Sequence, residues 1–309
     1  MMEAVYTDTW KNGLLEKKLR QAKKMLSSCT LCPRKCGVNR MEGEYGVCRT
    51  GEKAWVSDYG PHFGEEAPLT GSRGSGTVFF THCNLLCLFC QNFDISHQGA
   101  GRALGAGELA GMMLHLQKQG CHNINLVSPS HVVPQILEAL LIAAESGLHL
   151  PIVYNTGGYD RVSTLRLLEG IVDIYMPDFK FTDPEIARLA CDARDYPATA
   201  RQAVKEMHRQ VGDLYINEEG LAKRGVLLRH LILPRAMAGT REIMRFLAQE
   251  ISADTYVNLM TQYRPCGRAG EIPGFGEYPD RNDFAAAFQA AAEEGIHRLH
   301  GPRRVFVLT

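Results

Sequence analysis

Three cysteines stand close together in the segment CNLLCLFC, which comes directly after a short apolar run. Three thiolates from one loop, here Cys83, Cys87 and Cys90, suit three corners of an iron–sulfur cubane and leave the fourth iron open. An open coordination position is what catalysis at a metal requires. The alternative for this spacing is a three-cysteine zinc site completed by a distant ligand such as His82 or His97.

Four further cysteines lie in a segment punctuated by Gly and Pro, namely Cys29, Cys32, Cys36 and Cys48. Four sulfur ligands suit structural zinc or a second iron–sulfur cluster. The spacing differs from the bacterial ferredoxin run, which favours zinc slightly and leaves an auxiliary cluster open. Because the segment holds few apolar residues, we expect it to fold around the metal that these thiols bind.

The remaining three cysteines stand alone, and an isolated cysteine more often fills space than reacts. We therefore interpret Cys121 and Cys191 as packing residues. Cys266 follows the last expected strand, so packing is the first interpretation and a redox or substrate-thiyl role is the alternative.

The composition is that of a core-forming chain, with 309 residues, 34 basic and 34 acidic side chains and a formal net charge of zero. This balance argues against a broad surface for nucleic acid or anionic lipid. The first residues lack an apolar leader, and no stretch approaches the roughly 18 consecutive apolar residues that span a bilayer. We expect a cytoplasmic protein that binds neither nucleic acid nor membrane, whose reduced cysteines serve metal or redox chemistry.

Short apolar runs alternate with helical patterns from Thr77 onward, as in a parallel sheet covered by helices. Six such units predict an α/β fold, a partial (β/α)6 TIM-type barrel with an N-terminal cysteine-rich metal-binding extension, whose reactive groups gather at the carboxyl ends of the strands. The expected strands are 77–81, 123–127, 151–155, 171–176, 225–233 and 254–260. The expected helices are 10–28, 106–119, 132–146, 161–168, 183–189, 198–210, 239–250 and 283–294.

The same pattern predicts three parts along the chain. Residues 1–75 hold an N-terminal helix and the cysteine-rich metal-binding segment, and residues 76–265 form the partial barrel. Residues 266–309 form a loop and a helix.

The CNLLCLFC loop resembles the cluster loop of the radical S-adenosylmethionine superfamily, and within it the pyruvate formate-lyase activating enzyme-like proteins. In that loop the residue before the last cysteine is usually aromatic, here Phe89. The resemblance covers most of residues 29–268. It implies a [4Fe-4S] cluster on Cys83, Cys87 and Cys90, with S-adenosylmethionine on the open iron and its one-electron cleavage to a 5′-deoxyadenosyl radical.

Two later motifs extend the resemblance. The turn that starts at Asn155 and Thr156 resembles the family's D-T-N-G turn, and the segment MPDFK resembles its M-x-D-x-K. The resemblance implies that Thr156, Met176 and Asp178 help enclose a monovalent cation beside the S-adenosylmethionine carboxylate. Asn155 replaces a carboxylate by a neutral amide, which we expect to weaken cation binding or to change its selectivity.

Arg229 in RHLILP resembles the family's fifth-strand arginine, which approaches the bound cofactor. A charge within so apolar a strand needs a partner, and the cofactor carboxylate or Asp178 would satisfy it. A purely structural ion pair is the alternative. Together with Lys180 of the MPDFK segment, Arg229 is our candidate for the catalytic role. The segment Gln262-Tyr263-Arg264 falls where the family contacts adenine.

One expected motif is missing. The superfamily commonly has G-G-E after the second strand to bind the cofactor's amino group, whereas this chain has VSPSH at 127–131. Ser128 and Ser130 could accept those hydrogen bonds, less strongly than a carboxylate. His131 is either a proton carrier or a solvent-facing residue at a helix start. We expect Glu65 and Glu66 to lie in an exposed turn, with a place in the cofactor pocket or at a partner surface as alternatives.

Three hypotheses about function remain. The first is an iron–sulfur oxidoreductase that abstracts hydrogen from a partner polypeptide, for which the resemblance implies a glycyl-radical enzyme as candidate and a flavodoxin or ferredoxin as electron donor. The second keeps the radical chemistry and gives it a small molecule or another peptide as substrate. The third is a non-enzymatic zinc or redox-sensing protein with zinc at both cysteine groups.

Overall fold

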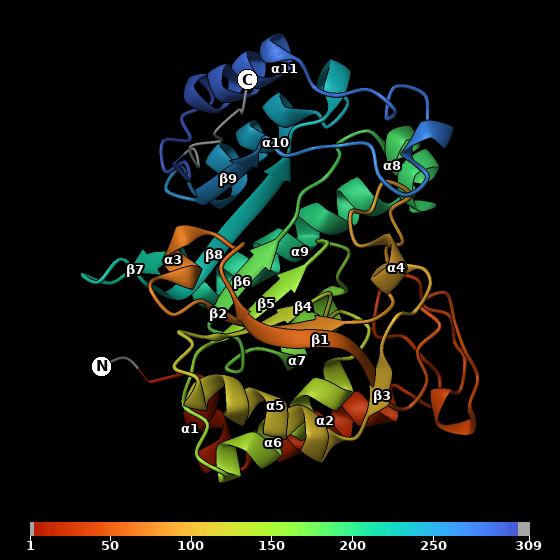
Figure 1. Ribbon diagram of the computed structural model, residues 1–309, viewed down its shortest axis with the longest axis vertical. Coiled ribbons are helices and arrows are strands. Elements are labelled where there is room, and N and C mark those ends of the chain that lie inside the picture. The colour runs from red at the N-terminus through yellow and green to blue at the C-terminus, as the bar shows by residue number, and fades with distance from the viewer. Residues whose placement is uncertain (1–2, 302–309) are drawn as a thin grey trace.

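The computed structural model describes residues 3–301 and shows a mixed α/β protein built on one nine-stranded sheet. The strands follow the order β3-β1-β2-β4-β5-β6-β8-β7, with β9 paired to β8 (Figure 1). The strands are β1 (Ala54–His62), β2 (Ser75–Phe80), β3 (Arg102–Leu104), β4 (Ile124–Val127), β5 (Ile152–Thr156), β6 (Ile174–Pro177), β7 (Tyr215–Ile216), β8 (Ala222–Leu231) and β9 (Tyr256–Met260).

Six of these strands, β2, β4, β5, β6, β8 and β9, run parallel, and each pairs with the next one in this series. They coincide with the six strands expected from the sequence. Between residues 3 and 301 no pairing joins β9 back to β2, so the sheet is open. β1 pairs antiparallel with β2, and β3 pairs antiparallel with β1. Neither β1 nor β3 is expected from the sequence.

Helices connect and cover the parallel strands. The helices are α1 (Tyr6–Lys11), α2 (Leu14–Lys24), α3 (Ala67–Thr70), α4 (Phe93–Ser96), α5 (Ala106–Lys118), α6 (Val133–Glu145), α7 (Val162–Leu167), α8 (Pro184–Cys191), α9 (Tyr196–Val211), α10 (Thr240–Phe246) and α11 (Arg281–Glu293). Figure 1 shows α2, α5 and α6 packed together at one end of the molecule and α10 and α11 at the other. No helix in residues 3–301 is long and apolar enough to cross a membrane.

Local sequence explains several of these boundaries. Asp183 accepts hydrogen bonds from the backbone N–H groups of Glu185 and Ile186 ahead of α8, and Pro184 takes the first helical position. Asp280 caps α11 in the same way. The single helix expected over 10–28 is two helices, because Gly13 adopts a left-handed conformation with φ of 67° between α1 and α2.

The interior of the curved sheet is filled by a small apolar cluster. Leu69 of α3 packs there with side chains of β5, β6 and β8. α3 therefore lies against the inner face of the sheet, and the loop before it reaches the same interior. The members of the cluster are Leu69, Val153, Ile174, Met176, Leu214, Ala222 and Leu227.

Candidate functional site

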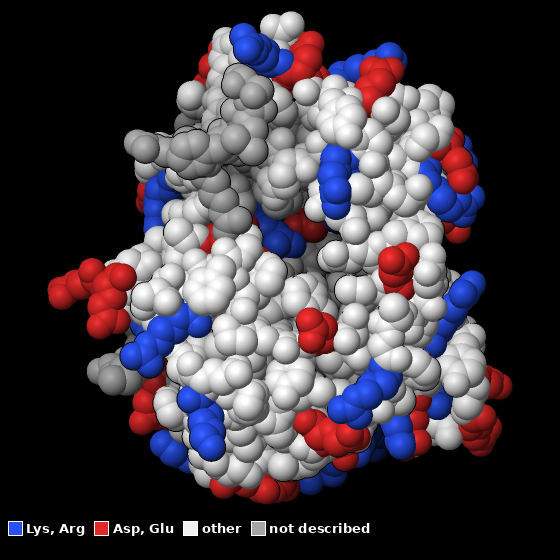
Figure 2. Space-filling model, in the orientation of Figure 1, with Lys and Arg blue, Asp and Glu red and all other residues white. Residues whose placement is uncertain are grey.

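A chamber of about 420 Å³ lies at the carboxyl ends of the parallel strands, and we call it the cluster chamber. Cys83, Cys87 and Cys90 all line it, so the structure brings together the three cysteines of the CNLLCLFC loop. The other residues that line it and bear on the argument are Glu65, Phe89, Ser128, Asn155, Thr156, Asp178, Lys180, Arg229, Gln262 and Tyr263. Figure 2 shows a hollow on this face of the molecule in which charged side chains of both signs are visible.

The loop that carries the three cysteines is held by backbone hydrogen bonds. Leu88 donates its N–H to the carbonyl of Ala190 at 2.8 Å, and accepts from the N–H of Arg268 at 2.7 Å. Leu86 adopts a left-handed conformation with φ of 56°, which turns the loop between Cys83 and Cys87.

Of the three thiols, Cys87 is buried, and Cys83 and Cys90 are half-buried. Burial raises the pKa of Cys83 to about 12 and also raises the pKa of Cys90. Hydrogen bonding with Cys191, followed by burial, raises the pKa of Cys87 well above its ordinary value. Ligation as thiolates would therefore release protons. Among residues 3–301, no three His, Cys, Asp or Glu side chains are arranged so that they could hold a single metal ion.

Cys191 lies beside this loop, and its Sγ is 3.3 Å from the Sγ of Cys87. It is buried at the end of α8. The sequence interpretation of Cys191 as a packing residue misses this contact. No signal in the sequence could have found it, because the two cysteines are 104 positions apart.

A network of charges also lines the cluster chamber. Asp178 accepts hydrogen bonds from Lys180 Nζ at 2.6 Å and from Arg229 Nε at 2.8 Å. Arg229 also donates to the amide oxygen of Asn155 at 2.8 Å. Burial alone would raise the pKa of Asp178, but the guanidinium of Arg229 and the ammonium of Lys180 hold it below its ordinary value. The predicted partnership of Arg229 with Asp178 is thus present.

The other predicted cofactor residues differ in their surroundings. Phe89 lines the chamber and packs against the ring of Phe275 at 5.3 Å between centroids. Thr156 also lines it, but its hydroxyl donates to Asp160 at 2.6 Å and lies 3.0 Å from the hydroxyl of Ser130. Met176 is fully buried in the apolar cluster under the sheet and is not among the residues that line the chamber.

Asp160 is a buried carboxylate that the sequence reasoning missed. It accepts from Tyr154 Oη at 3.0 Å as well as from Thr156. Its position within the turn NTGGYD is the signal that could have found it, since an Asp side chain in a turn is well placed to accept local hydrogen bonds. The result is a Thr156 hydroxyl held in one orientation.

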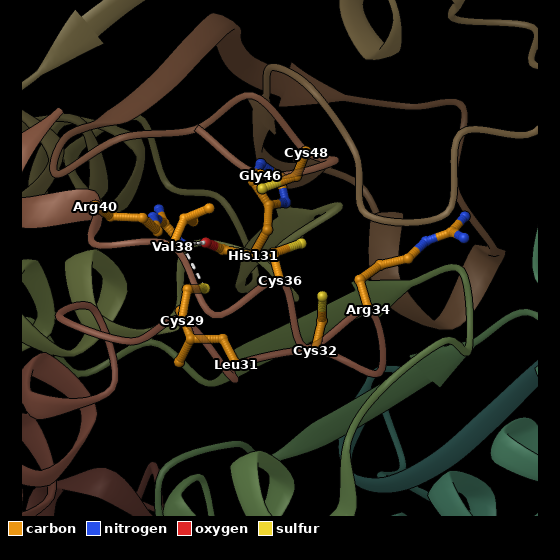
Figure 3. A pocket seen from close by; sticks show the side chains of 10 residues that line it. All are labelled: Cys29, Leu31, Cys32, Arg34, Cys36, Val38, Arg40, Gly46, Cys48 and His131. Carbon is orange, nitrogen blue, oxygen red and sulfur yellow. Dashed lines mark hydrogen bonds between the residues drawn. The ribbon is translucent and has the colours of Figure 1, made fainter. Parts of the chain in front are cut away.

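The four-cysteine group lies apart from the cluster chamber. Cys29, Cys32, Cys36 and Cys48 line one small pocket, and Figure 3 shows their sulfurs turned toward the same space. Burial raises the pKa of Cys32 to about 12, and the pKa of Cys48 is raised for the same reason. The sequence prediction that these four thiols are near one another agrees with this arrangement.

Two arginines attach the four-cysteine group to the rest of the protein. Arg40, which is 1% exposed, donates to the carbonyl of His131 at 2.8 Å and to that of Gly51 at 2.7 Å. The side chain of Arg34 points away from the four sulfurs in Figure 3. It donates to the carbonyls of Asn84 at 3.0 Å, Leu85 at 3.2 Å, Cys191 at 2.7 Å and Asp192.

His131 does not face solvent, so that interpretation is wrong. It is 1% exposed, and its Nε2 lies 3.0 Å from the carbonyl oxygen of Thr81. Burial, together with the charge of Arg40, lowers the pKa of His131 to about 3. The imidazole is therefore neutral at physiological pH and links β2 to the four-cysteine group.

Glu65 and Glu66 do not lie in an exposed turn, and that expectation is also wrong. Glu65 is 8% exposed and Glu66 is 4% exposed. The reason is that α3 packs inside the curved sheet and carries the preceding loop with it. Glu65 lines the cluster chamber, and its Oε2 is 3.5 Å from Arg229 Nη1.

Comparison with known proteins gives one informative match. No protein-family profile matches the chain. The chain is similar to an uncharacterized protein of Methanocaldococcus jannaschii, MJ0674, with 30% identical residues over 298 positions. The match covers 94% of this chain and 82% of the relative.

Proposed function

The chain belongs to the same family as this uncharacterized archaeal protein, and we propose that it is a radical S-adenosylmethionine enzyme. The proposal has Cys83, Cys87 and Cys90 hold a [4Fe-4S] cluster, with S-adenosylmethionine in the cluster chamber. One observation carries it: three cysteines from one loop share a chamber with buried charged side chains at the carboxyl ends of parallel strands. In this proposal the open sheet is a partial (β/α)6 barrel with a cysteine-rich metal-binding extension.

The residues present fit these two groups. Thiolates are the ligands that iron–sulfur clusters use, and three of them line the chamber. Its volume of about 420 Å³ falls within the range of sites for small organic molecules. When bound, the cluster supplies one electron, which cleaves S-adenosylmethionine to a 5′-deoxyadenosyl radical.

The charged wall would bind and orient the cofactor. Lys180 and Arg229 are the cations of the chamber, and they are our candidates for binding a carboxylate. Asp178 holds both of them in place through hydrogen bonds of 2.6 and 2.8 Å. The aromatic ring of Phe89 would cover the apolar side and help exclude water.

The proposed function also includes a site for a monovalent cation, but one with weak affinity. Both oxygens of Asp178 already accept hydrogen bonds, and the amide oxygen of Asn155 accepts one from Arg229. A cation would have to displace these donors. We therefore propose weaker cation binding here than a carboxylate at position 155 would give.

Hydrogen abstraction from a partner polypeptide, with a glycyl-radical enzyme as candidate, is the first form of the activity that we propose. A flavodoxin or ferredoxin is the proposed electron donor. Abstraction from a small molecule is the second form. It is favoured by a further chamber next to the first, which is lined by a buried carboxylate.

Anaerobic reconstitution with iron and sulfide tests the core of the proposal. We expect the wild-type protein to take up iron and sulfide, to absorb near about 410 nm and to release 5′-deoxyadenosine from S-adenosylmethionine under a strong reductant. Cys83→Ala should take up less iron and sulfide and release no 5′-deoxyadenosine, whereas Cys121→Ala, which removes a buried thiol outside both cysteine groups, should behave as the wild type does. Equal iron and sulfide in the two variants would reject the proposal.

The polypeptide form has its own test. Electron paramagnetic resonance is recorded on reduced protein with S-adenosylmethionine and a candidate glycyl-radical enzyme. A glycyl doublet supports the activase form. Release of 5′-deoxyadenosine without any doublet rejects that form and leaves the small-molecule form.

The four-cysteine group is proposed to hold zinc or an auxiliary iron–sulfur cluster. Elemental analysis of Cys83→Ala, in which the first cluster is removed, distinguishes the two. About one zinc per chain indicates zinc, and remaining iron with sulfide indicates a second cluster.

A further inference from the structure

A second chamber of about 340 Å³ adjoins the cluster chamber, and we call it the side chamber. Glu65 and Arg229 line both, so the two chambers meet at this pair. Glu66 and Asn258 line only the side chamber. The side chamber is thus next to the place where the proposed chemistry occurs, but it is separate from the three cysteines.

Glu66 is a buried carboxylate with an incomplete set of partners. Its Oε1 accepts a hydrogen bond from Asn258 Nδ2 at 2.7 Å. Its Oε2 is buried and has no hydrogen-bond partner in the described part of the chain. A buried carboxylate without a compensating donor is costly, and a neutral amide satisfies only one of its oxygens.

The charges around the two chambers do not balance. Among the described residues that line them, the carboxylates are Glu65, Glu66 and Asp178, the side chains with a permanent positive charge are Lys180 and Arg229, and the histidines are His62, His82 and His300. Lys180 and Arg229 both bind Asp178, and Arg229 also contacts Glu65 and Asn155. Among the described residues, neither basic side chain forms a hydrogen bond or an ion pair with Glu66, although, against the effect of burial, the charge of Glu66, after that of Asp178, raises the pKa of Arg229.

We propose that Glu66 and Asn258 form a substrate subsite that binds an ammonium or guanidinium group. Such a group brings the missing positive charge and also an N–H donor for the second carboxylate oxygen. The subsite rests on the proposed function, because it uses the neighbouring cluster chamber as the place of reaction. A substrate anchored at Glu66 would present its other end toward Glu65 and Arg229, where the chambers meet.

Binding of small cationic probes to the reconstituted protein tests this subsite. The probes are n-butylguanidinium and n-butylammonium, with tetramethylammonium as a cation of equal charge that lacks N–H donors. We expect saturable binding of the first two, at least about tenfold weaker binding of tetramethylammonium, and a loss of at least about tenfold in Glu66→Gln. Glu145→Gln, an exposed position on α6, should bind as the wild type does.

A second arm distinguishes the source of the cationic group. The peptide acetyl-Gly-Lys-Gly-amide is compared with n-butylammonium on the same protein. Tighter binding of the peptide assigns the subsite to a lysine or arginine side chain of a polypeptide. Tighter binding of the free amine assigns it to a small molecule, and either result supports the cationic subsite.

Three results would overturn the inference. They are equal binding by Glu66→Gln and wild type with unchanged unfolding midpoints, displacement of the probes by S-adenosylmethionine at one equivalent, and no saturable binding by protein that holds its cluster and releases 5′-deoxyadenosine. The last result rejects the subsite and leaves the proposed function standing. Saturable, Glu66-dependent binding by protein that takes up no iron supports the cation site and rejects the proposed function.

Discussion

At the scale of single residues, the Cys191 thiol is a close polar neighbour of Cys87, one of the proposed cluster ligands. It lies 3.3 Å from the Sγ of Cys87 and is buried with it. Hydrogen bonds to ligand sulfurs are one of the means by which proteins set the reduction potential of an iron–sulfur cluster. Cys191 therefore has a testable effect on the electronic properties of the proposed site.

We expect Cys191→Ala to lower the reduction potential of the reconstituted cluster, on the order of tens of millivolts, because the thiolate of Cys87 loses a donor. A redox titration followed by electron paramagnetic resonance measures it. Cys121→Ala removes another buried thiol and serves as the control. An unchanged or higher potential in Cys191→Ala would contradict the role as a donor.

The sequence predicts which candidate ligands lie close together, but it does not predict which other residues contact them. The spacing of Cys83, Cys87 and Cys90 is a local property, so a loop that brings them together can be predicted. The contact of Cys191 with Cys87 and the burial of Glu66 depend on how distant segments pack. Neither has a local pattern, because one lies at the end of an amphipathic helix and the other lies in a loop before a short helix.

At the scale of elements, Arg34 joins three parts of the chain that are distant in sequence. Its guanidinium donates to carbonyls of the cluster loop at Asn84 and Leu85, and to those at the end of α8. It also lies over the ring of Tyr159 at 5.4 Å. A planar fork can reach several carbonyls at once, which a lysine ammonium in the same place cannot do.

We expect Arg34→Lys to lower the iron content at Cys83, Cys87 and Cys90 by about half or more, and to destabilise the protein by about 2 kcal/mol, because buried carbonyls lose their donors. Iron analysis and urea unfolding measure the two effects. Arg20→Lys on the exposed face of α2 is the matched control. Equal iron loading and equal urea midpoints in the two variants would contradict this role of Arg34.

The sequence predicts some strands of the sheet better than others. The central parallel strands β4, β5 and β6 are almost entirely buried on both faces, so their pattern is strong. β1 reads AWVSDYGPH, which contains Gly and Pro and lacks a continuous apolar run. It is a strand because it pairs with β2, and that pairing is a tertiary property.

At the scale of the whole molecule, a buried carboxylate fastens the first residues of the described chain to the sheet. Asp173 accepts hydrogen bonds from the backbone N–H of Val5 at 2.9 Å and from that of Ile152 at 2.8 Å. Burial raises the pKa of Asp173 to about 7. In the unfolded chain an aspartate has a pKa of about 4.

This difference makes stability depend on pH. Because the folded-state pKa is raised, the contribution of Asp173 is fully present below about pH 4 and is lost as the pH rises to about 7. We expect the free energy of unfolding of the wild type to fall by up to about 1.4 kcal/mol per pH unit, relative to Asp173→Asn, in this window. Urea unfolding at pH 5.5, 6.5 and 7.5 measures it, and parallel pH profiles would contradict it.

β1 begins shortly after the four-cysteine group and ends shortly before Glu65 and Glu66. A strand of nine residues is about 30 Å long and cannot be stretched, because its backbone is already extended. It is therefore a connection of fixed length between the four-cysteine group and the side chamber. If the four-cysteine group binds metal as proposed, removal of the metal with a chelator should increase amide hydrogen exchange along β1, as far as the loop that carries the two glutamates.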